Sequence, residues 1–182
     1  MIDEFGRPDW DSWFMALCFT IARKSIDPST KHGCIAVAPD KTILSIGYNG
    51  PLRNAIDNNI PLTRPEKYPF LPHSESNCVI NAARNGISLN GCTFYVTGFP
   101  CESCFAMMVQ AGAKKIIYGP QGSHMINDER IRVIERMKEG QKVELIKLEK
   151  EKIETALKTI IDAGNILAEL LRKSNESIQK NT

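Results

Sequence analysis

The sequence lacks long apolar runs: no stretch approaches the roughly 18 consecutive apolar residues that a membrane-spanning helix requires. Residues 1–11 are acidic and polar instead of basic and then apolar, so they lack the pattern of a secretory signal. Internal repeats and low-complexity segments are also missing. We therefore expect no membrane partner and a location in the cytoplasm, or in the host cytoplasm if the source is a virus.

A dominant charge of one sign is missing as well. The chain has 23 Lys and Arg residues against 21 Asp and Glu residues, which gives a formal net charge of +2. Such a weak basic field does not favour a nucleic-acid partner, whereas a small anionic ligand is easily accommodated. At 182 residues, of which 42% are hydrophobic, the chain is long enough for one domain with a substantial core.

The cysteines do not have the pattern of a disulfide framework. Of the six, Cys101 and Cys104 lie three residues apart, and the other four are scattered through apolar segments. We expect Cys18, Cys34 and Cys92 to be core thiols. The close pair indicates a metal site in a reducing compartment.

Hydrophobic periodicity and turn residues predict five helices and five strands. The helices are expected at residues 10–24, 74–85, 101–111, 127–140 and 149–174, and the strands at 34–38, 42–48, 92–97, 115–118 and 142–148. The first two strands form a hairpin, and helices between the later strands imply right-handed crossovers. The predicted fold is α/β: a three-layer α/β/α sandwich around a mixed five-stranded sheet. Between 49 and 72, five prolines and no sustained period predict a long ordered loop, which in a compact domain is usually functional.

Two short motifs carry candidate metal ligands. His73-Ser74-Glu75 is followed, one helix and one strand later, by Pro100-Cys101-Glu102-Ser103-Cys104. The imidazole of His73 and the thiolates of Cys101 and Cys104 are ligands that zinc binds well, and three protein ligands leave the fourth tetrahedral position open for water. Both motifs lie at helix starts, so the positive ends of two helices should converge on the ion. We predict one catalytic Zn²⁺ per subunit.

Glu75 is the predicted proton carrier of this site. Two thiolates cancel the charge of the dication and weaken its effect on bound water, so an auxiliary base is needed. Glu75 lies two residues from His73, close to the water but outside the ligand set. The alternative is a structural zinc with four protein ligands, for which Cys78 is the nearest remaining candidate.

His-x-Glu followed by Pro-Cys-x-x-Cys is the signature of zinc deaminases. From about Trp10 to Leu148 the sequence resembles the cytidine and deoxycytidylate deaminase superfamily, and within it the deoxycytidylate deaminases most. The likeness includes Arg23-Lys24-Ser25-Ile26-Asp27-Pro28, Gly33-Cys34, Gly47-Tyr48-Asn49-Gly50, Lys67-Tyr68-Pro69-Phe70, Phe99-Pro100-Cys101 and Gln110-Ala111-Gly112. It implies a cytidine deaminase-like fold, with residues 1–148 as the zinc-dependent deaminase domain.

Residues 149–182 are predicted to be a C-terminal helical extension of that domain. Its apolar stripe from Ile153 to Leu171 is too extensive for a solvated tail. Two interpretations stay open at this point: the helix packs on its own domain, or it forms a contact between subunits.

The resemblance also implies a reaction and its substrate contacts. The reaction is the zinc-dependent hydrolytic deamination of dCMP to dUMP and ammonia, which supplies dUMP for dTTP synthesis. Asn49 is expected to contact the sugar, and the carboxylate of Glu75 to meet the edge of the base. The candidates for holding the 5′-phosphate are Arg23, Ser25 and Lys31.

Two residues depart from the family pattern. Ser74 stands between the zinc histidine and the glutamate, where alanine is usual, and its backbone should still face the base. Gly98 replaces a bulkier residue before Phe-Pro-Cys, which is expected to widen the pocket.

Other functions remain open at this level. Deaminases of dCTP, cytidine or 5-substituted dCMP share the motifs, and so do enzymes that edit RNA or single-stranded DNA, although the modest charge does not favour a nucleic-acid channel. A catalytically silent, zinc-stabilised binding protein is a further alternative, against which the presence of both His73 and Glu75 argues. The resemblance implies a homo-oligomer, with a hexamer as the expected form and dCTP and dTTP as expected effectors.

Overall fold

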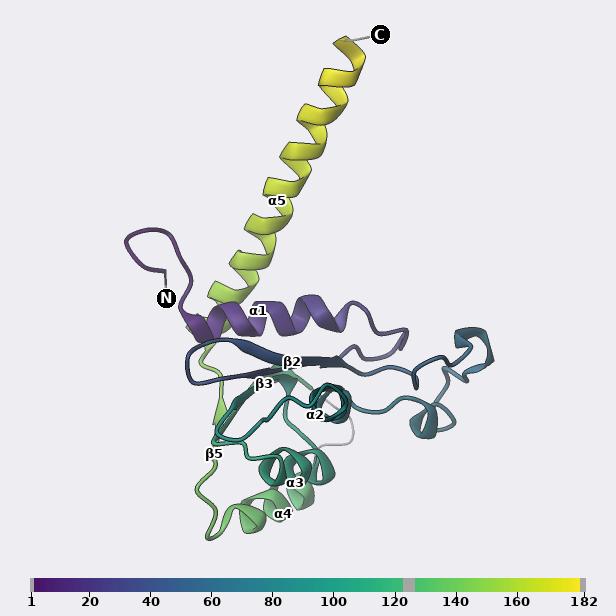
Figure 1. Ribbon diagram of the computed structural model, residues 1–182, viewed down its shortest axis with the longest axis vertical. Coiled ribbons are helices and arrows are strands. Elements are labelled where there is room, and N and C mark those ends of the chain that lie inside the picture. Colours follow the sequence, from purple (N-terminus) through teal and green to yellow (C-terminus); the bar gives the residue numbers. More distant parts are fainter. Residues whose placement is uncertain (1, 123–126, 181–182) are drawn as a thin grey trace.

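The computed structural model describes residues 2–122 and 127–180. Its elements, in chain order, are α1 (Trp10–Ala22), β1 (Gly33–Val37), β2 (Ile43–Tyr48), the 3-10 turns η1 (Asp57–Asn59) and η2 (Tyr68–Phe70), α2 (Ser74–Arg84), β3 (Thr93–Gly98), α3 (Glu102–Gln110), β4 (Lys115–Gln121), α4 (Asp128–Lys138), β5 (Glu144–Lys147) and α5 (Lys150–Lys180). The predicted order of helices and strands is confirmed, and apart from the end of α5 the bounds differ by only a few residues (Figure 1).

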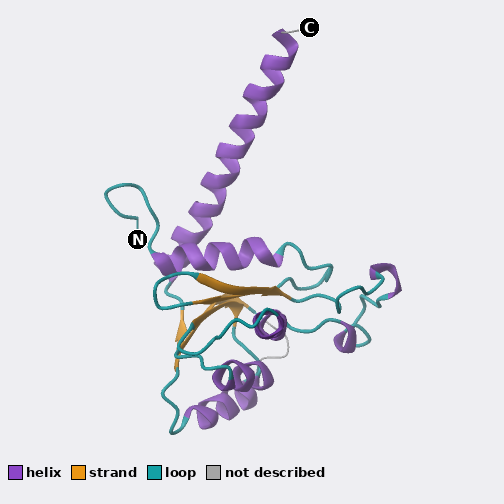
Figure 2. Cartoon of the chain, viewed as in Figure 1, coloured by secondary structure: helices purple, strands orange, loops and turns teal. Residues whose placement is uncertain are grey.

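The five strands form one sheet in the order β2-β1-β3-β4-β5. β1 pairs antiparallel with both β2 and β3, whereas β3 with β4 and β4 with β5 pair parallel. Parallel neighbours need a crossover connection, and α3 and α4 supply the two that are required. The predicted mixed five-stranded sheet is thereby confirmed (Figure 2).

Helices cover both faces of the sheet, and each face has its own core. On β1, Cys34 and Ala36 pack toward α2, α3 and α4, while Ile35 and Val37 pack toward α1 and the start of α5. Side chains alternate between the faces of a strand, so the five consecutive buried residues of β1 serve both cores. This arrangement is the predicted three-layer α/β/α sandwich.

Four cysteines are buried in these cores. Cys18, Cys34, Cys78 and Cys92 are free thiols with no exposed surface. The prediction of core thiols is confirmed for the three residues named above. Cys78 packs in the same core as Cys34 and Cys92, which leaves it as a core residue and not as a fourth metal ligand.

The last helix leaves the body of the molecule. α5 continues to Lys180, whereas the sequence pattern predicted an end at residue 174. Ala156 is buried against α1, and Ile153 and Ile160 lie against the same core, but every side chain from Ile161 to residue 174 is exposed. Figure 1 shows this part of α5 projecting away from the sandwich as a single rod. In the described part of the chain, no helix is both long enough and apolar enough to cross a bilayer.

Candidate active site and metal centre

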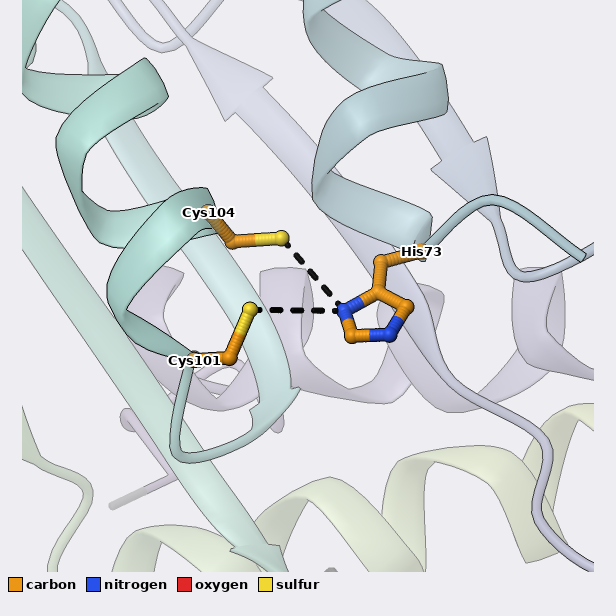
Figure 3. A group of neighbouring side chains, drawn as sticks. All are labelled: His73, Cys101 and Cys104. Carbon is orange, nitrogen blue, oxygen red and sulfur yellow. Dashed lines mark hydrogen bonds between the residues drawn. The ribbon is translucent and has the colours of Figure 1, made fainter. Parts of the chain in front are cut away.

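The candidate metal ligands come from two helix starts. His73 is the N-cap of α2, Cys101 is the N-cap of α3, and Cys104 lies in the first turn of α3 (Figure 3). α2 lies close against β2 because Gly47 has no side chain: a Cβ there would stand 2.2 Å from the carbonyl oxygen of Ser74. Two helix starts therefore converge at one point, as predicted, and their positive dipole ends favour the thiolate forms of the cysteines.

Three donor atoms lie close enough to share one metal ion. Nδ1 of His73 is 3.6 Å from Sγ of Cys101 and 3.5 Å from Sγ of Cys104. In a zinc tetrahedron, bonds of about 2.0 Å to nitrogen and 2.3 Å to sulfur place these atoms about 3.5 Å apart. The donor spacing thus fits zinc, and among the described residues no further His, Cys, Asp or Glu joins the group. Three ligands leave room for water, which is the arrangement of a catalytic site and not of a structural one.

The two metal-ligand motifs affect each other's pKa values. A hydrogen bond with Cys104 lowers the pKa of Cys101 to about 4, although burial acts in the opposite direction, and His73 beside it adds to the effect. The hydrogen bond with Cys101 in turn raises the pKa of His73, against the effect of burial. The lowered pKa favours the thiolate form of Cys101, which is the form that a metal ion binds.

Glu75 is buried beside the metal ligands but is not one of them. It is 5% exposed, and burial raises the pKa of its carboxyl group, against the opposing effect of nearby His73. The hydroxyl of Ser74 donates a hydrogen bond of 2.8 Å to Oε2 of Glu75. Ser74 therefore orients the carboxylate, a contact that the sequence pattern did not predict.

A cavity of about 330 Å³ opens over these side chains. This volume lies within the range of small-molecule sites, about 300 to 1,000 Å³. His73, Glu75 and Cys101 line it together with side chains of the loop between β2 and α2, among them Arg64 and Lys67. The loop predicted to be functional therefore forms one wall of the candidate site. Together with the lining residues between α1 and β1, which are Asp27, Thr30 and His32, we call it the loop wall.

Asn49 lies in that wall, at the end of β2, and is 7% exposed. Its Oδ1 accepts the backbone N–H of His32 at 2.6 Å, and its Nδ2 donates to the carbonyl oxygen of Thr30 at 2.9 Å. Oδ1 retains a second lone pair, because an amide oxygen accepts two hydrogen bonds. Asn49 thus joins two segments of the wall, and its contact with a sugar stays a prediction.

The three residues nominated for phosphate binding lie elsewhere. Arg23 is exposed at the C-cap of α1, and Ser25 is 2% exposed with its hydroxyl accepting the N–H of Asp27. Lys31 donates to the carbonyl oxygen of Ser25. None of the three lines the cavity, so the structure does not bring them together with the metal ligands. Their role stays a prediction.

A buried ion pair fixes the loop wall, and sequence reasoning missed it. Nζ of Lys67 lies 2.6 Å from both carboxylate oxygens of Asp27, and the two residues are 2% and 5% exposed. Burial raises the pKa of Asp27, but the hydrogen bond with Lys67 and the backbone N–H groups of Ser29 and Thr30 outweigh it and lower the pKa. The only sequence signal was a lysine placed directly before the Tyr68-Pro69-Phe70 segment.

Arg64 is a cation of the cavity lining with no acidic partner among the described residues. Of the other two cations in the lining, Lys67 is paired with Asp27, and Arg130 lies 3.6 Å from Glu102. Arg64 is exposed, and its guanidinium donates to the hydroxyl of Thr30 at 3.2 Å. It is therefore the lining cation best able to bind an added anion.

His32 fills the space in front of Gly98. A Cβ at Gly98 would stand 3.2 Å from Cε1 of His32 and 2.3 Å from the carbonyl oxygen of Gln121. The expected widening of the pocket at Gly98 is therefore offset by an imidazole in the lining. Burial, together with the charge of His73, lowers the pKa of His32 to about 4, so the ring is neutral at physiological pH. Its Nδ1 lies 3.0 Å from the hydroxyl oxygen of Thr97.

Comparison with known proteins places this geometry in a family. Residues 8–120 match the model of the cytidine and deoxycytidylate deaminase zinc-binding region. The mouse (Mus musculus) and human (Homo sapiens) deoxycytidylate deaminases are 36% and 35% identical over 116 residues, which is 60% of this chain and 64% of each of those proteins. The chain therefore spans slightly less than two thirds of the length of these relatives.

A solved structure shows the same architecture. The dCMP deaminase from the cyanophage S-TIM5, crystallised with dCMP and dUMP, superimposes with a TM-score of 0.66 at 28% identity. The match covers 78% of this chain and 98% of the phage protein. Since the family model covers more than half of the chain and the metal ligands have the spacing that zinc requires, this protein belongs to the zinc-binding cytidine and deoxycytidylate deaminase family.

Proposed function

We propose that the protein hydrolyses dCMP to dUMP and ammonia, and thereby supplies dUMP for dTTP synthesis. The observation that carries this proposal is the buried Glu75 beside a three-ligand metal site, inside a cavity of nucleotide size, in a chain of this family. The phage relative of similar fold binds dCMP and dUMP, which supports a deoxycytidylate substrate.

The chain supplies the proton transfers of the reaction. When bound at His73, Cys101 and Cys104, zinc supplies a Lewis acid that makes a water molecule acidic enough to lose a proton near neutral pH. Glu75 accepts that proton and delivers it to N3 of the cytosine. It then takes the remaining proton from the oxygen that has bonded to C4 and delivers it to the departing amine. The water oxygen bonds to C4, the C4–N bond breaks, and ammonia leaves. Ser74 holds the Glu75 carboxylate through its hydroxyl during both transfers.

The loop wall is proposed to select a monophosphate. In this proposal Asn49 accepts a hydrogen bond from the sugar through the second lone pair of Oδ1. For the phosphate, Arg64 joins the earlier candidates Arg23, Ser25 and Lys31, and it is the one that lines the cavity. A guanidinium suits this task because its fixed donors match phosphate oxygens in pairs.

The experiment compares dCMP with deoxycytidine on the zinc-loaded protein. If the phosphate is a required handle, dCMP has the higher kcat/KM by about a hundredfold or more, which corresponds to roughly 2.7 kcal/mol. Equal values would show that the protein is a nucleoside deaminase. Arg64→Leu is expected to lower the ratio of kcat/KM for dCMP to kcat/KM for deoxycytidine, mainly by raising KM for dCMP. Arg53→Leu is the matched control, because Arg53 lies on the same loop but bonds to Asn81 outside the cavity lining.

The remaining candidates are related substrates. Ammonia release is measured with dCMP, dCTP, cytidine and 5-substituted dCMP in turn, which distinguishes these candidates. The preferred substrate is the one with the highest kcat/KM.

The assembly, its effectors and its location are proposals as well. We expect a cytoplasmic homo-oligomer, with a hexamer as the form implied by resemblance, and control by dCTP and dTTP. Light scattering of the protein with and without each nucleotide measures the mass, and rates at low dCMP measure activation or inhibition. A monomer would contradict the proposed assembly, and a rate that neither nucleotide changes would contradict the proposed control.

A further inference from the structure

The projecting part of α5 carries an apolar face that no residue within 2–122 or 127–180 covers. We define the α5 stripe as Leu157, Ile161, Gly164, Leu167, Ala168, Leu170 and Leu171. Its five leucine and isoleucine residues are between 51% and 59% exposed. Soluble proteins rarely leave so large a contiguous apolar surface in water, and such a surface usually marks an interaction site.

The stripe contains the outer half of a longer apolar seam, which has the spacing of a helix that pairs with another helix. Ile153, Leu157, Ile160, Gly164, Leu167 and Leu171 follow one another at intervals of four and three residues. This alternation keeps the residues on one seam, as in coiled coils, where helices wind around each other. In the first turns, Ile153 and Ile160 already pack on α1, so this seam does act as a packing surface in the structure.

The opposite side of α5 is polar. Arg172 pairs with Glu176, and Lys173 pairs with Glu169, both along the helix. These pairs stabilise the exposed helix and mark which side faces water. Polar and apolar residues are therefore separated around the axis, and the helix is prepared for one partner surface.

The charges of α5 indicate the kind of partner. Residues 150–180 contain six basic and five acidic residues, so the helix has almost no net charge. A helix that lies on an anionic membrane surface is rich in Lys and Arg on its polar face, and α5 is not. A strongly acidic or strongly basic protein partner would also find no complementary net charge on α5. A partner with the same balance of charge fits best.

We infer that the α5 stripe is a contact between two copies of this chain, in which the projecting part of α5 pairs with the same helix of a second copy. An identical helix supplies a seam with the same intervals and the same charge balance. Gly164 lies in the middle of the stripe with nothing within 4 Å of a Cβ added there, so two backbones can approach closely at this point. Two such stripes bury on the order of 1,000 Å², the area at which specific interfaces begin.

The surface is separate from the candidate active site, because none of its residues lines the cavity. The inference therefore does not rest on the proposed reaction. It names the surface through which copies of the chain associate, and its failure leaves the deaminase proposal intact.

Two neighbouring residues provide a matched test. Leu167 lies on the seam, whereas Ile166 lies about 100° around the helix from it and outside the seam's spacing of four and three residues. The two side chains are 59% and 63% exposed. The variants Leu167→Lys and Ile166→Lys are compared with the unchanged full-length protein. Zinc content and the rate with dCMP, which neither change should affect, show that the domain is folded.

Mass and amide hydrogen exchange are the two measurements. By light scattering, we expect Leu167→Lys to reduce the mass at least twofold over a dilution series, and Ile166→Lys to leave it unchanged. If other contacts also hold the assembly together, amide hydrogen exchange provides the test. Residues 161–174 should be protected from exchange in the unchanged protein and in Ile166→Lys. In Leu167→Lys the same residues should exchange at least tenfold faster. Equal protection in all three proteins overturns the inference.

The other possible occupant is tested directly. The unchanged protein is mixed with vesicles of phosphatidylcholine and phosphatidylserine and sedimented. We expect the protein to stay in the supernatant. Sedimentation that Leu167→Lys abolishes, combined with a monomer mass in the absence of vesicles, would assign the stripe to a lipid surface and overturn the pairing of two copies.

Discussion

The two walls of the cavity are built in different ways. The metal wall comes from the starts of α2 and α3, where His73, Cys101 and Cys104 follow from short local motifs. The loop wall depends on a contact between residues 40 positions apart, the buried pair of Lys67 and Asp27. The first wall holds the groups that perform chemistry, and the second shapes the space for the substrate. Changes to the metal wall should therefore affect zinc and turnover, whereas changes to the loop wall should affect substrate affinity.

The largest effect is expected at a metal ligand. Cys104→Ala removes one of three zinc ligands, so the variant should lose most of its zinc, its activity and part of its thermal stability, because metal affinity contributes to folding. Metal analysis and a thermal melt measure both losses. Cys92→Ala is the control, since Cys92 is a buried core thiol away from the metal group and its removal should leave the zinc in place. Full zinc occupancy in Cys104→Ala would contradict the three-ligand site.

The next effect concerns turnover without loss of metal. Glu75→Gln keeps the shape of the side chain but removes the proton carrier, so kcat should fall by about 10³-fold or more while zinc stays bound. Ser74→Ala on the same wall removes only the hydrogen bond that orients Glu75, and a fall of about tenfold or less is expected. If Glu75→Gln also loses its zinc, Glu75 is a ligand and the assignment of roles is wrong.

The same contrast explains what the sequence could predict. The metal wall was predictable because a histidine before one helix and two cysteines three residues apart at the start of another are fixed by local geometry. The loop wall was not, because the pairing of Lys67 with Asp27, the approach of His32 to Gly98 and the position of Arg64 arise only when distant segments meet. For the same reason Arg23, Ser25 and Lys31 were nominated as a phosphate site from their sequence position, and the structure places them outside the cavity lining.

The fold shows a similar division. The alternation of strands and helices gave the sheet and both helical layers, because periodicity reports directly on burial. The same periodicity predicted an apolar stripe on α5, but it did not predict which part of that stripe packs on the rest of the domain. Residues such as Ile160 and Leu167 have the same pattern in the sequence, yet one packs on the core and the other is exposed. The pattern shows which face of a helix is apolar and leaves its partner undetermined.

A smaller effect is expected when the loop wall is loosened. Lys67→Met leaves the carboxylate of Asp27 buried without its partner, which should cost about 3 to 5 kcal/mol of stability. KM for dCMP should rise more than kcat falls, because the metal wall stays intact. Denaturant unfolding and steady-state kinetics measure the two effects. In the double variant Asp27→Asn with Lys67→Met no charge is left buried, so much of the stability should return; no recovery would mean that the lysine acts through something other than this pair.

The smallest expected effect is a pH dependence that belongs to His32. In the unfolded chain its pKa is near 6.5, whereas burial lowers it to about 4 in the folded protein. Between these values the unfolded state binds a proton that the folded state does not, so this residue makes the protein less stable as pH falls through that window. From pH 7.5 to 5.5 the loss of stability due to His32 should be about 1 kcal/mol.

The variant His32→Gln keeps a polar side chain that does not titrate. Over the same pH interval, the stability of this variant should therefore fall by about 1 kcal/mol less than that of the unchanged protein. Urea unfolding of both zinc-loaded proteins at each pH gives the difference, in which the contributions of all other groups cancel. Identical pH slopes would show that the imidazole is not held in its neutral form, and the loop wall would then carry a positive charge in mildly acidic solution.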